Sequence, residues 1–158
     1  MKKNGFTLVE LLAVITIIGI LAGVAIPVTY IYINKARKNN YNTMESSAQT
    51  AAENYFLSDG HNGEILGKKC VSVPVAKLVS EDYLEKMIDP KNNNVICSGK
   101  VWVYNESIEN GSALDSYKYY VQIRCDNYYH TFMSDGKTPG GYKEFPGGKY
   151  VDSLPSGC

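Results

Sequence analysis

A long apolar run, residues 6–33, constrains this 158-residue chain more than any other feature, and it carries a single charge, Glu10. About 20 apolar residues in a helix are enough to cross the hydrocarbon core of a bilayer, so the run predicts one membrane-spanning helix. Lys2 and Lys3 precede the run, and the next basic residue is Lys35. This charge bias places the N-terminus in the cytoplasm and residues 58–158 outside the membrane.

Glu10 is unexpected in such a helix. A charged side chain at the centre of a bilayer costs roughly 2.5–3.5 kcal/mol, so its presence needs a reason. An ordinary secretory signal peptide fits poorly, because its apolar region would be shorter and would end at a small-residue cleavage site. Two interpretations remain: an uncleaved single-pass anchor for an extracellular binding domain, or a helix in which Glu10 has a specific partner.

The residues around Glu10 form a specific motif. Residues 3–12 read Lys-Asn-Gly-Phe-Thr-Leu-Val-Glu-Leu-Leu. This segment resembles the processing site of type IV pilins and of the related pseudopilins. The resemblance implies a precursor that a prepilin peptidase cleaves between Gly5 and Phe6, followed by N-methylation of the new Phe6 amine. Removal of the leader, residues 1–5, would leave 153 of the 158 residues.

The same resemblance provides a partner for Glu10. Cleavage creates a cation at Phe6, one helical turn away, and the N-terminus of a helix favours a nearby anion. When helices pack in an apolar filament core, a Glu10 without its partner would be destabilised by roughly 3–5 kcal/mol. The Phe6 amine of a neighbouring copy would satisfy it and fix the register between subunits. Thr7 belongs to the same assembly motif.

Gly19, Gly23 and Pro27 complete the resemblance within the apolar run. A G-x-x-x-G pair allows helices to approach closely, and Pro27 removes the hydrogen bond to the Gly23 carbonyl. In filaments of the resembled family, a stretch such as residues 19–27 can lose its helical structure. The alternative for the glycine pair is a generic dimer face between transmembrane helices.

The helical pattern continues past the membrane run, and we expect one helix from about Thr7 to Leu57. Residues 34–57 form its amphipathic half, because apolar side chains recur there every three or four positions. This stripe consists of Ala36, Tyr41, Met44, Ala48, Ala51, Ala52, Tyr55 and Phe56. The opposite, polar face holds Asn39, Asn42, Glu45, Gln49 and Glu53.

Residues 58–158 differ in composition, with frequent Gly, Asn, Asp, Ser and Tyr. Ser80 would cap a short helix over residues 80–87, and a turn would follow at Asp89-Pro90. Alternating patterns predict strands at residues 100–104, 117–125 and 128–133, whereas the Gly- and Pro-containing tail, residues 137–158, should be irregular. The expected fold class is α+β: a long N-terminal helix packed against a small antiparallel β-sheet, with a disulfide-closed C-terminal loop.

Four cysteines, Cys70, Cys97, Cys125 and Cys158, indicate two disulfides in an exported domain. Three pairings are possible. The resemblance to pilins, many of which have a C-terminal disulfide loop, favours Cys125–Cys158 and therefore Cys70–Cys97. The alternative pairs Cys97 with Cys125. A zinc site is disfavoured, because the sequence lacks C-x-x-C and H-x-x-x-H spacing.

The sequence contains no recognisable catalytic or cofactor motif, and it predicts no metal site. The chain has 16 basic and 16 acidic residues. Loss of Lys2 and Lys3 with the leader would leave 14 basic against 16 acidic residues, a net charge near −2. This balance predicts no direct nucleic-acid footprint. The sequence thus indicates a structural protein rather than an enzyme.

The combined patterns predict a major or minor pilin, the structural subunit of a type IV pilus for adhesion, motility or DNA uptake. Its precursor would lie in the cytoplasmic membrane, and the processed subunit in an extracellular filament on the cell surface. The implied partners are a prepilin peptidase, copies of itself and other pilins, and, indirectly, an assembly platform protein and an ATPase motor. A pseudopilin of a type II secretion or competence system is the alternative within the family. The uncleaved anchored binding domain is the alternative outside it.

Overall fold

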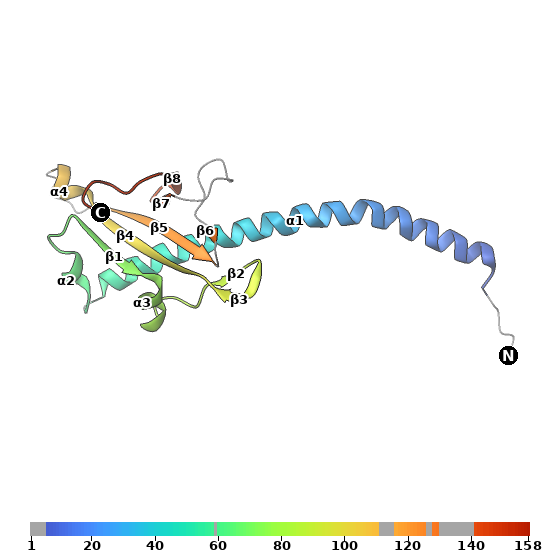
Figure 1. The fold of residues 1–158 in the computed structure, drawn as a ribbon, viewed down its shortest axis with the longest axis horizontal. Coiled ribbons are helices and arrows are strands. Elements are labelled where there is room, and N and C mark those ends of the chain that lie inside the picture. The colour runs from blue at the N-terminus through green and yellow to red at the C-terminus, as the bar shows by residue number, and fades with distance from the viewer. Residues whose placement is uncertain (1–5, 59, 111–115, 126–127, 130–140) are drawn as a thin grey trace. The chain divides into compact units, whose positions relative to one another are not determined.

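The computed structural model describes residues 6–58, 60–110, 116–125, 128–129 and 141–158. The chain contains one long helix, α1, and a series of short helices and strands that follow it (Figure 1). The helices are α1 (Leu8–Leu57), α2 (Asn62–Ile65), α3 (Val75–Ser80) and α4 (Glu106–Asn110). The strands are β1 (Cys70–Pro74), β2 (Ile88–Asp89), β3 (Asn92–Ile96), β4 (Ser98–Asn105), β5 (Tyr117–Cys125), β6 (Tyr128–Tyr129), β7 (Tyr142–Phe145) and β8 (Lys149–Val151).

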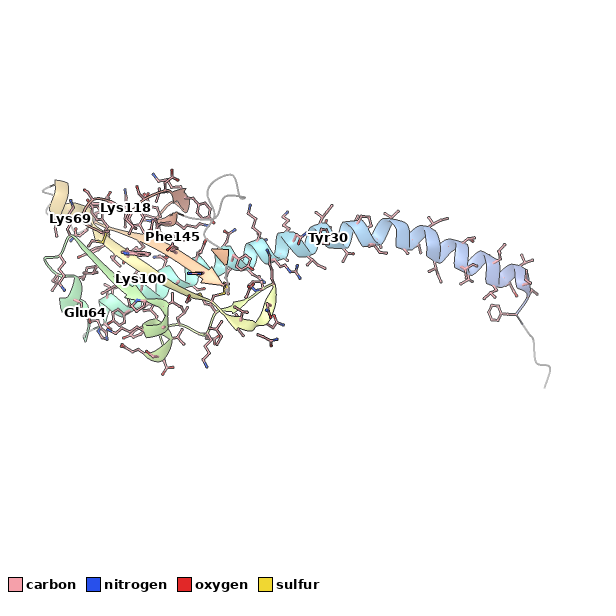
Figure 2. The ribbon with its side chains drawn as sticks, viewed as in Figure 1. Tyr30, Glu64, Lys69, Lys100, Lys118 and Phe145 are labelled. Atoms are coloured by element: carbon pink, nitrogen blue, oxygen red, sulfur yellow. A yellow bond between two sulfur atoms is a disulfide. The ribbon has the colours of Figure 1, made fainter. Side chains whose placement is uncertain are left out.

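The chain divides into two compact units, Met1–Asn39 and Asn40–Cys158, and α1 contributes to both. In the first unit α1 contains a segment long and apolar enough to cross a membrane. Figure 2 shows the side chains of this segment projecting from the ribbon, and its large apolar side chains, from Phe6 to Ile33, are exposed. The helix remains regular through Pro27. Because residues 6–39 include no buried apolar side chain, the apolar surface of this segment has to be covered by lipid or by other helices.

The second unit, which we call the head, is an α+β fold, as predicted. Its main sheet has the strand order β1-β4-β5-β7-β8, with β6 also paired to β5, and every neighbouring pair is antiparallel. β4 and β5 form its centre, in a register that places Val101 opposite Val121. Strands β2 and β3 form a separate two-stranded sheet, and the predicted turn at Asp89-Pro90 joins them.

The core of the head lies between the second half of α1 and one face of the main sheet (Figure 1). Successive residues of a strand point to opposite faces, so Val101 and Val103 of β4 face the helix while Trp102 faces away. The helix contributes Tyr41, Ala48, Ala51, Ala52, Tyr55 and Phe56, all buried, with Met44 packed beside them. The predicted stripe is therefore confirmed from Tyr41 onward, whereas Ala36 is exposed.

Two local predictions for the head were wrong. The short helix covers Val75–Ser80, not residues 80–87, and Ser80 stands at its end. Asp82 has a φ of 60°, in the left-handed region, which a continuing α-helix cannot contain. The tail is not irregular, because β7 and β8 extend the main sheet there. Of the strand expected at residues 128–133, β6 covers the first two positions and the rest lies outside the described residues.

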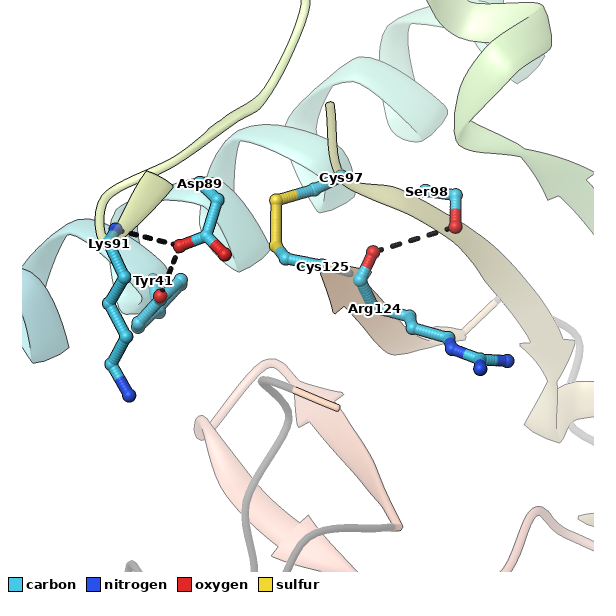
Figure 3. The surroundings of a disulfide bond; sticks show 7 residues. All are labelled: Tyr41, Asp89, Lys91, Cys97, Ser98, Arg124 and Cys125. Atoms are coloured by element: carbon cyan, nitrogen blue, oxygen red, sulfur yellow. Dashed lines mark hydrogen bonds between the residues drawn. A yellow bond between two sulfur atoms is a disulfide. The ribbon is translucent and has the colours of Figure 1, made fainter. Parts of the chain in front are cut away.

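The disulfide pairing that the resemblance favoured was also wrong. The bonds are Cys70–Cys158 and Cys97–Cys125, the second of which was the alternative. In the β4–β5 register Ser98 lies opposite Arg124, so Cys97 and Cys125 meet one step further along, with Cα atoms 4.2 Å apart (Figure 3). Cys70 lies opposite Tyr104, at the other end of β4. That separation is about 20 Å along the strand, too far for a bond between Cys70 and Cys97.

The Cys70–Cys158 bond ties the C-terminus of the chain to the edge strand β1, and it closes a loop with a sequence separation of 88. We expect the variant with both cysteines changed to Ala to lose about 4 kcal/mol of unfolding free energy, because a cross-link over a long loop restricts the unfolded chain. Urea unfolding of the detergent-solubilised full chain, followed by the fluorescence of Trp102, the only tryptophan, measures the loss. An unchanged urea midpoint would contradict this role for the bond.

Candidate functional site

The beginning of α1 is closed by a reciprocal pair of side chains, Thr7 and Glu10. The Thr7 backbone N–H donates to Glu10 Oε2 at 2.9 Å, and the Thr7 hydroxyl donates to the same oxygen at 2.8 Å. The Glu10 backbone N–H donates in return to Thr7 Oγ1 at 3.3 Å. This is a capping box, which satisfies backbone donors that an α-helix leaves open at its first turn. The spacing Thr-x-x-Glu was visible in the sequence, and it would have assigned this role to Thr7.

The capping box uses only one of the two Glu10 carboxylate oxygens. Among the contacts of the described residues, Oε2 accepts both hydrogen bonds and Oε1 accepts none. A carboxylate can accept hydrogen bonds at both oxygens. The Glu10 side chain is therefore held in place by its own chain, with one oxygen still able to accept a bond from another donor.

The other predicted assembly residues lie along the same exposed segment. Phe6 precedes the capping box with 85% of its surface exposed, while Gly5 lies outside the described residues. A Cβ added at Gly19 or Gly23 would meet no atom within 4 Å. No contact among the described residues therefore requires a glycine at these positions, and the close approach that they permit is available to another helix. Pro27 stands inside α1, which stays helical at this position.

The head contains a buried charged cluster, and two of its members, Glu45 and Asn42, were predicted to lie on the polar face of the helix. Glu45 on α1 is fully buried, and its Oε2 lies 3.3 Å from Lys143 Nζ of β7. The Tyr150 hydroxyl of β8 donates to the same carboxylate oxygen at 3.2 Å, and Lys143 also donates to Asn42 Oδ1 at 3.1 Å. Burial, followed by the nearby Glu45 charge, raises the pKa of Tyr150, so its hydroxyl stays protonated and able to donate.

A second polar cluster surrounds the C-terminal end of α1. The His61 ring stacks on Tyr55 at 3.9 Å between centroids, and its two nitrogens lie 2.9 Å from Glu64 Oε1 and 3.0 Å from Glu81 Oε2. The hydrogen bond with His61 is the main reason that the pKa of Glu64 is lowered. Lys77 donates a short hydrogen bond to the Tyr55 hydroxyl, which raises the pKa of Lys77. These contacts join α1, α2 and α3, and we assign the cluster a structural role.

In the part of the chain that the structure describes, no group of three or more His, Cys, Asp or Glu side chains is arranged to hold a metal ion. The arrangement that remains for function is the N-terminal one: an exposed apolar helix that carries a single, pre-positioned carboxylate in its first turn. Such a helix can bind other helices in an apolar environment and pair with a cation there.

Comparison with known proteins agrees with this geometry. Residues 1–26 match the family model described as a prokaryotic N-terminal methylation motif. A fimbrial protein of Neisseria meningitidis serogroup B is 31% identical over 122 residues, which cover 70% of this chain and 69% of that protein. The chain belongs to the type IV pilin family. No solved structure matches this pilin.

Two other relatives match this pilin over a shorter stretch. Fimbrial protein EcpB of Eikenella corrodens is 42% identical over 59 residues, 37% of each chain. The type IV major fimbrial protein FimA of Dichelobacter nodosus is 40% identical over 62 residues, 39% of each chain. The relatives are structural pilin and fimbrial proteins, and this pilin is likewise a structural protein and not an enzyme.

Tyr119 of β5 should make the stability of the head of this pilin depend on pH in the alkaline range. Burial, with the nearby charge of Glu53, raises the pKa of Tyr119 to about 12, from an ordinary value of 10.0. Below pH 10 neither the folded nor the unfolded chain ionises here, so the full contribution of the neutral phenol is present. Between pH 10 and about 12 only the unfolded chain releases the proton, and the free energy of unfolding falls as pH rises.

We therefore expect the urea midpoint of the head to fall more steeply above pH 10 in the parent protein than in Tyr119→Phe, which has no phenol proton to release. Burial also raises the pKa of Tyr120 and of Tyr150, so part of the decline persists in the variant. Urea titrations of both proteins between pH 8 and pH 11.5, followed by Trp102 fluorescence, provide the comparison. Parallel curves for the two proteins would contradict the assignment.

Proposed function

We propose that this pilin is a major or minor subunit of a type IV pilus, stored in the cytoplasmic membrane and assembled into a surface filament. The observation that carries the proposal is the first turn of α1, where Thr7 holds Glu10 through Oε2 and leaves Oε1 open among the described contacts. In the membrane precursor the capping box satisfies the carboxylate within one chain. In the filament, Oε1 accepts a hydrogen bond from the Phe6 amine of a neighbouring subunit.

The rest of the chain is consistent with this division of roles. Residues 1–5 form a leader that prepilin peptidase removes, residues 6–33 form the membrane span and later the filament core, residues 34–57 form the amphipathic half of the helix, and residues 58–158 form the disulfide-linked outer part. Lys2 and Lys3 keep the N-terminus on the cytoplasmic side, where the leader is cut. A platform protein and an ATPase motor then extract the subunit, which packs against copies of itself and other pilins.

Mass analysis of filaments sheared from native cells tests this proposal. We expect an abundant species that begins at N-methylated Phe6 and carries two disulfides. A cleaved species confined to the membrane fraction would instead indicate a pseudopilin of a type II secretion or competence system. A chain that still begins at Met1, in cells with an active prepilin peptidase, would refute the filament proposal and leave an anchored extracellular domain.

A further inference from the structure

A cleft in the head lies between the second half of α1 and the turn that joins β7 to β8, and the pilus proposal assigns it no role. Its volume is about 490 Å³, within the usual range for small-molecule sites. Its lining is formed by Gln49, Glu53, Tyr117, Tyr119, Phe145, Pro146 and Gly147. All of these residues belong to the head, and Figure 2 labels Phe145 among them.

One wall of the cleft is aromatic, and the strand register explains why. Tyr117 and Tyr119 are two positions apart on β5, so their side chains point to the same face of the sheet. Phe145 of β7 lies directly opposite Tyr119 and therefore shares that face. All three rings are partly buried against the core. The strands thus bring three aromatic side chains to one side of the cleft.

The other wall is polar and carries a negative charge. Gln49 and Glu53 are four residues apart on α1, so they lie on one face of the helix. The Gln49 side-chain amide donates to Glu53 Oε2 at 2.9 Å, which orients the carboxylate. Among the described residues Glu53 forms no ion pair. The basic residue of β7, Lys143, contacts Glu45 and Asn42 instead.

We propose that this cleft binds a small organic cation with a trimethylammonium group. Aromatic rings present a negative face, and several rings beside a partly desolvated cation are the usual way in which proteins recognise quaternary ammonium groups. The Glu53 carboxylate, oriented by Gln49, supplies the opposite charge. An anion would be repelled by the Glu53 carboxylate, and a neutral apolar ligand would gain no electrostatic attraction from it.

The test uses the full chain, solubilised in a maltoside detergent so that no choline headgroup is present. Choline is the probe, and 3,3-dimethylbutan-1-ol is its neutral control of the same shape. Saturation-transfer NMR on the methyl protons and calorimetric titration measure binding. We expect choline to bind and the alcohol to bind at least about tenfold more weakly, because only the cation gains from the rings and the carboxylate. Phosphocholine, titrated in parallel, shows whether the cleft accepts the group when it is attached to a phosphate.

Variants connect the binding to the two walls. Glu53→Gln should weaken choline about tenfold, whereas the same change at Glu85, an exposed residue that does not line the cleft, should not. Tyr119→Leu should also weaken binding, while Tyr119→Phe keeps the ring and should retain it. Equal binding of the alcohol, no binding of choline, or unchanged binding in Glu53→Gln would each overturn the proposal. Glu53→Gln should leave filament yield unchanged, so this test and that of the pilus proposal fail independently.

Discussion

Glu10→Ala should abolish filaments while leaving the pilin in the membrane. If Glu10 pairs with the Phe6 amine of a neighbour in an apolar core, its removal leaves that cation buried without a partner. The loss is roughly 3–5 kcal/mol for each subunit added, which corresponds to a decrease of more than about a hundredfold in each association constant. Sheared filaments, quantified against the membrane pool of the same cells, measure the effect. A normal filament yield from this variant would refute the role of Glu10 in assembly.

Thr7→Val separates the capping role of the first turn from its role between subunits. The variant loses the hydroxyl that donates to Glu10 Oε2, but it keeps the backbone N–H that donates to the same oxygen. The expected cost is about 1 kcal/mol, the usual value of an N-cap side chain, so filament yield should fall only a few-fold. Glu85→Gln removes an exposed carboxylate of the head. It is the control for the charge lost in Glu10→Ala, and it should assemble normally. If Thr7→Val were as defective as Glu10→Ala, capping alone would explain the requirement for Glu10.

The long helix could be predicted from the sequence because its signals are local. Its C-terminal end at Leu57 was read from the chain directly, because Asp59-Gly60 follows the last apolar position and Gly is a poor helix former. The buried stripe from Tyr41 to Phe56 followed from three- and four-residue spacing. The capping box is equally local, but we predicted for Glu10 only a partner in another subunit and not Thr7, three residues away. The sequence therefore contained more of the assembly site than we predicted from it.

The errors in the head concern contacts between residues far apart in the chain. Glu45 was placed on a polar helix face, because nothing near it in the sequence indicates that Lys143 and Tyr150 cover it. Those partners belong to β7 and β8, in a tail whose Gly and Pro residues suggested irregular structure. The disulfides depend in the same way on strand register, since Cys97 meets Cys125 only because Ser98 pairs with Arg124. Spacing of cysteines alone carries no information about register.

Lys143→Met should destabilise the head by roughly 3–5 kcal/mol, because it leaves the buried Glu45 carboxylate without its cation. Glu45 would retain the hydrogen bond from the Tyr150 hydroxyl, which cannot replace the lost charge. Native domains are stable by only about 5–15 kcal/mol, so the variant should unfold at a much lower urea concentration. Urea titration of the detergent-solubilised full chain, followed by Trp102 fluorescence, measures the shift.

The same substitution one strand away distinguishes a buried pair from an exposed one. Lys149 of β8 lies 3.6 Å from Glu144, but 68% of its side chain is exposed, and Lys149→Met should cost less than about 1 kcal/mol. The double variant Glu45→Leu/Lys143→Met replaces both buried charges with apolar groups, and it should recover most of the stability lost in Lys143→Met. If Lys143→Met and Lys149→Met had equal effects, Lys143 would contribute no more than a surface ion pair, and the junction of α1 with β7 and β8 would depend on apolar packing alone.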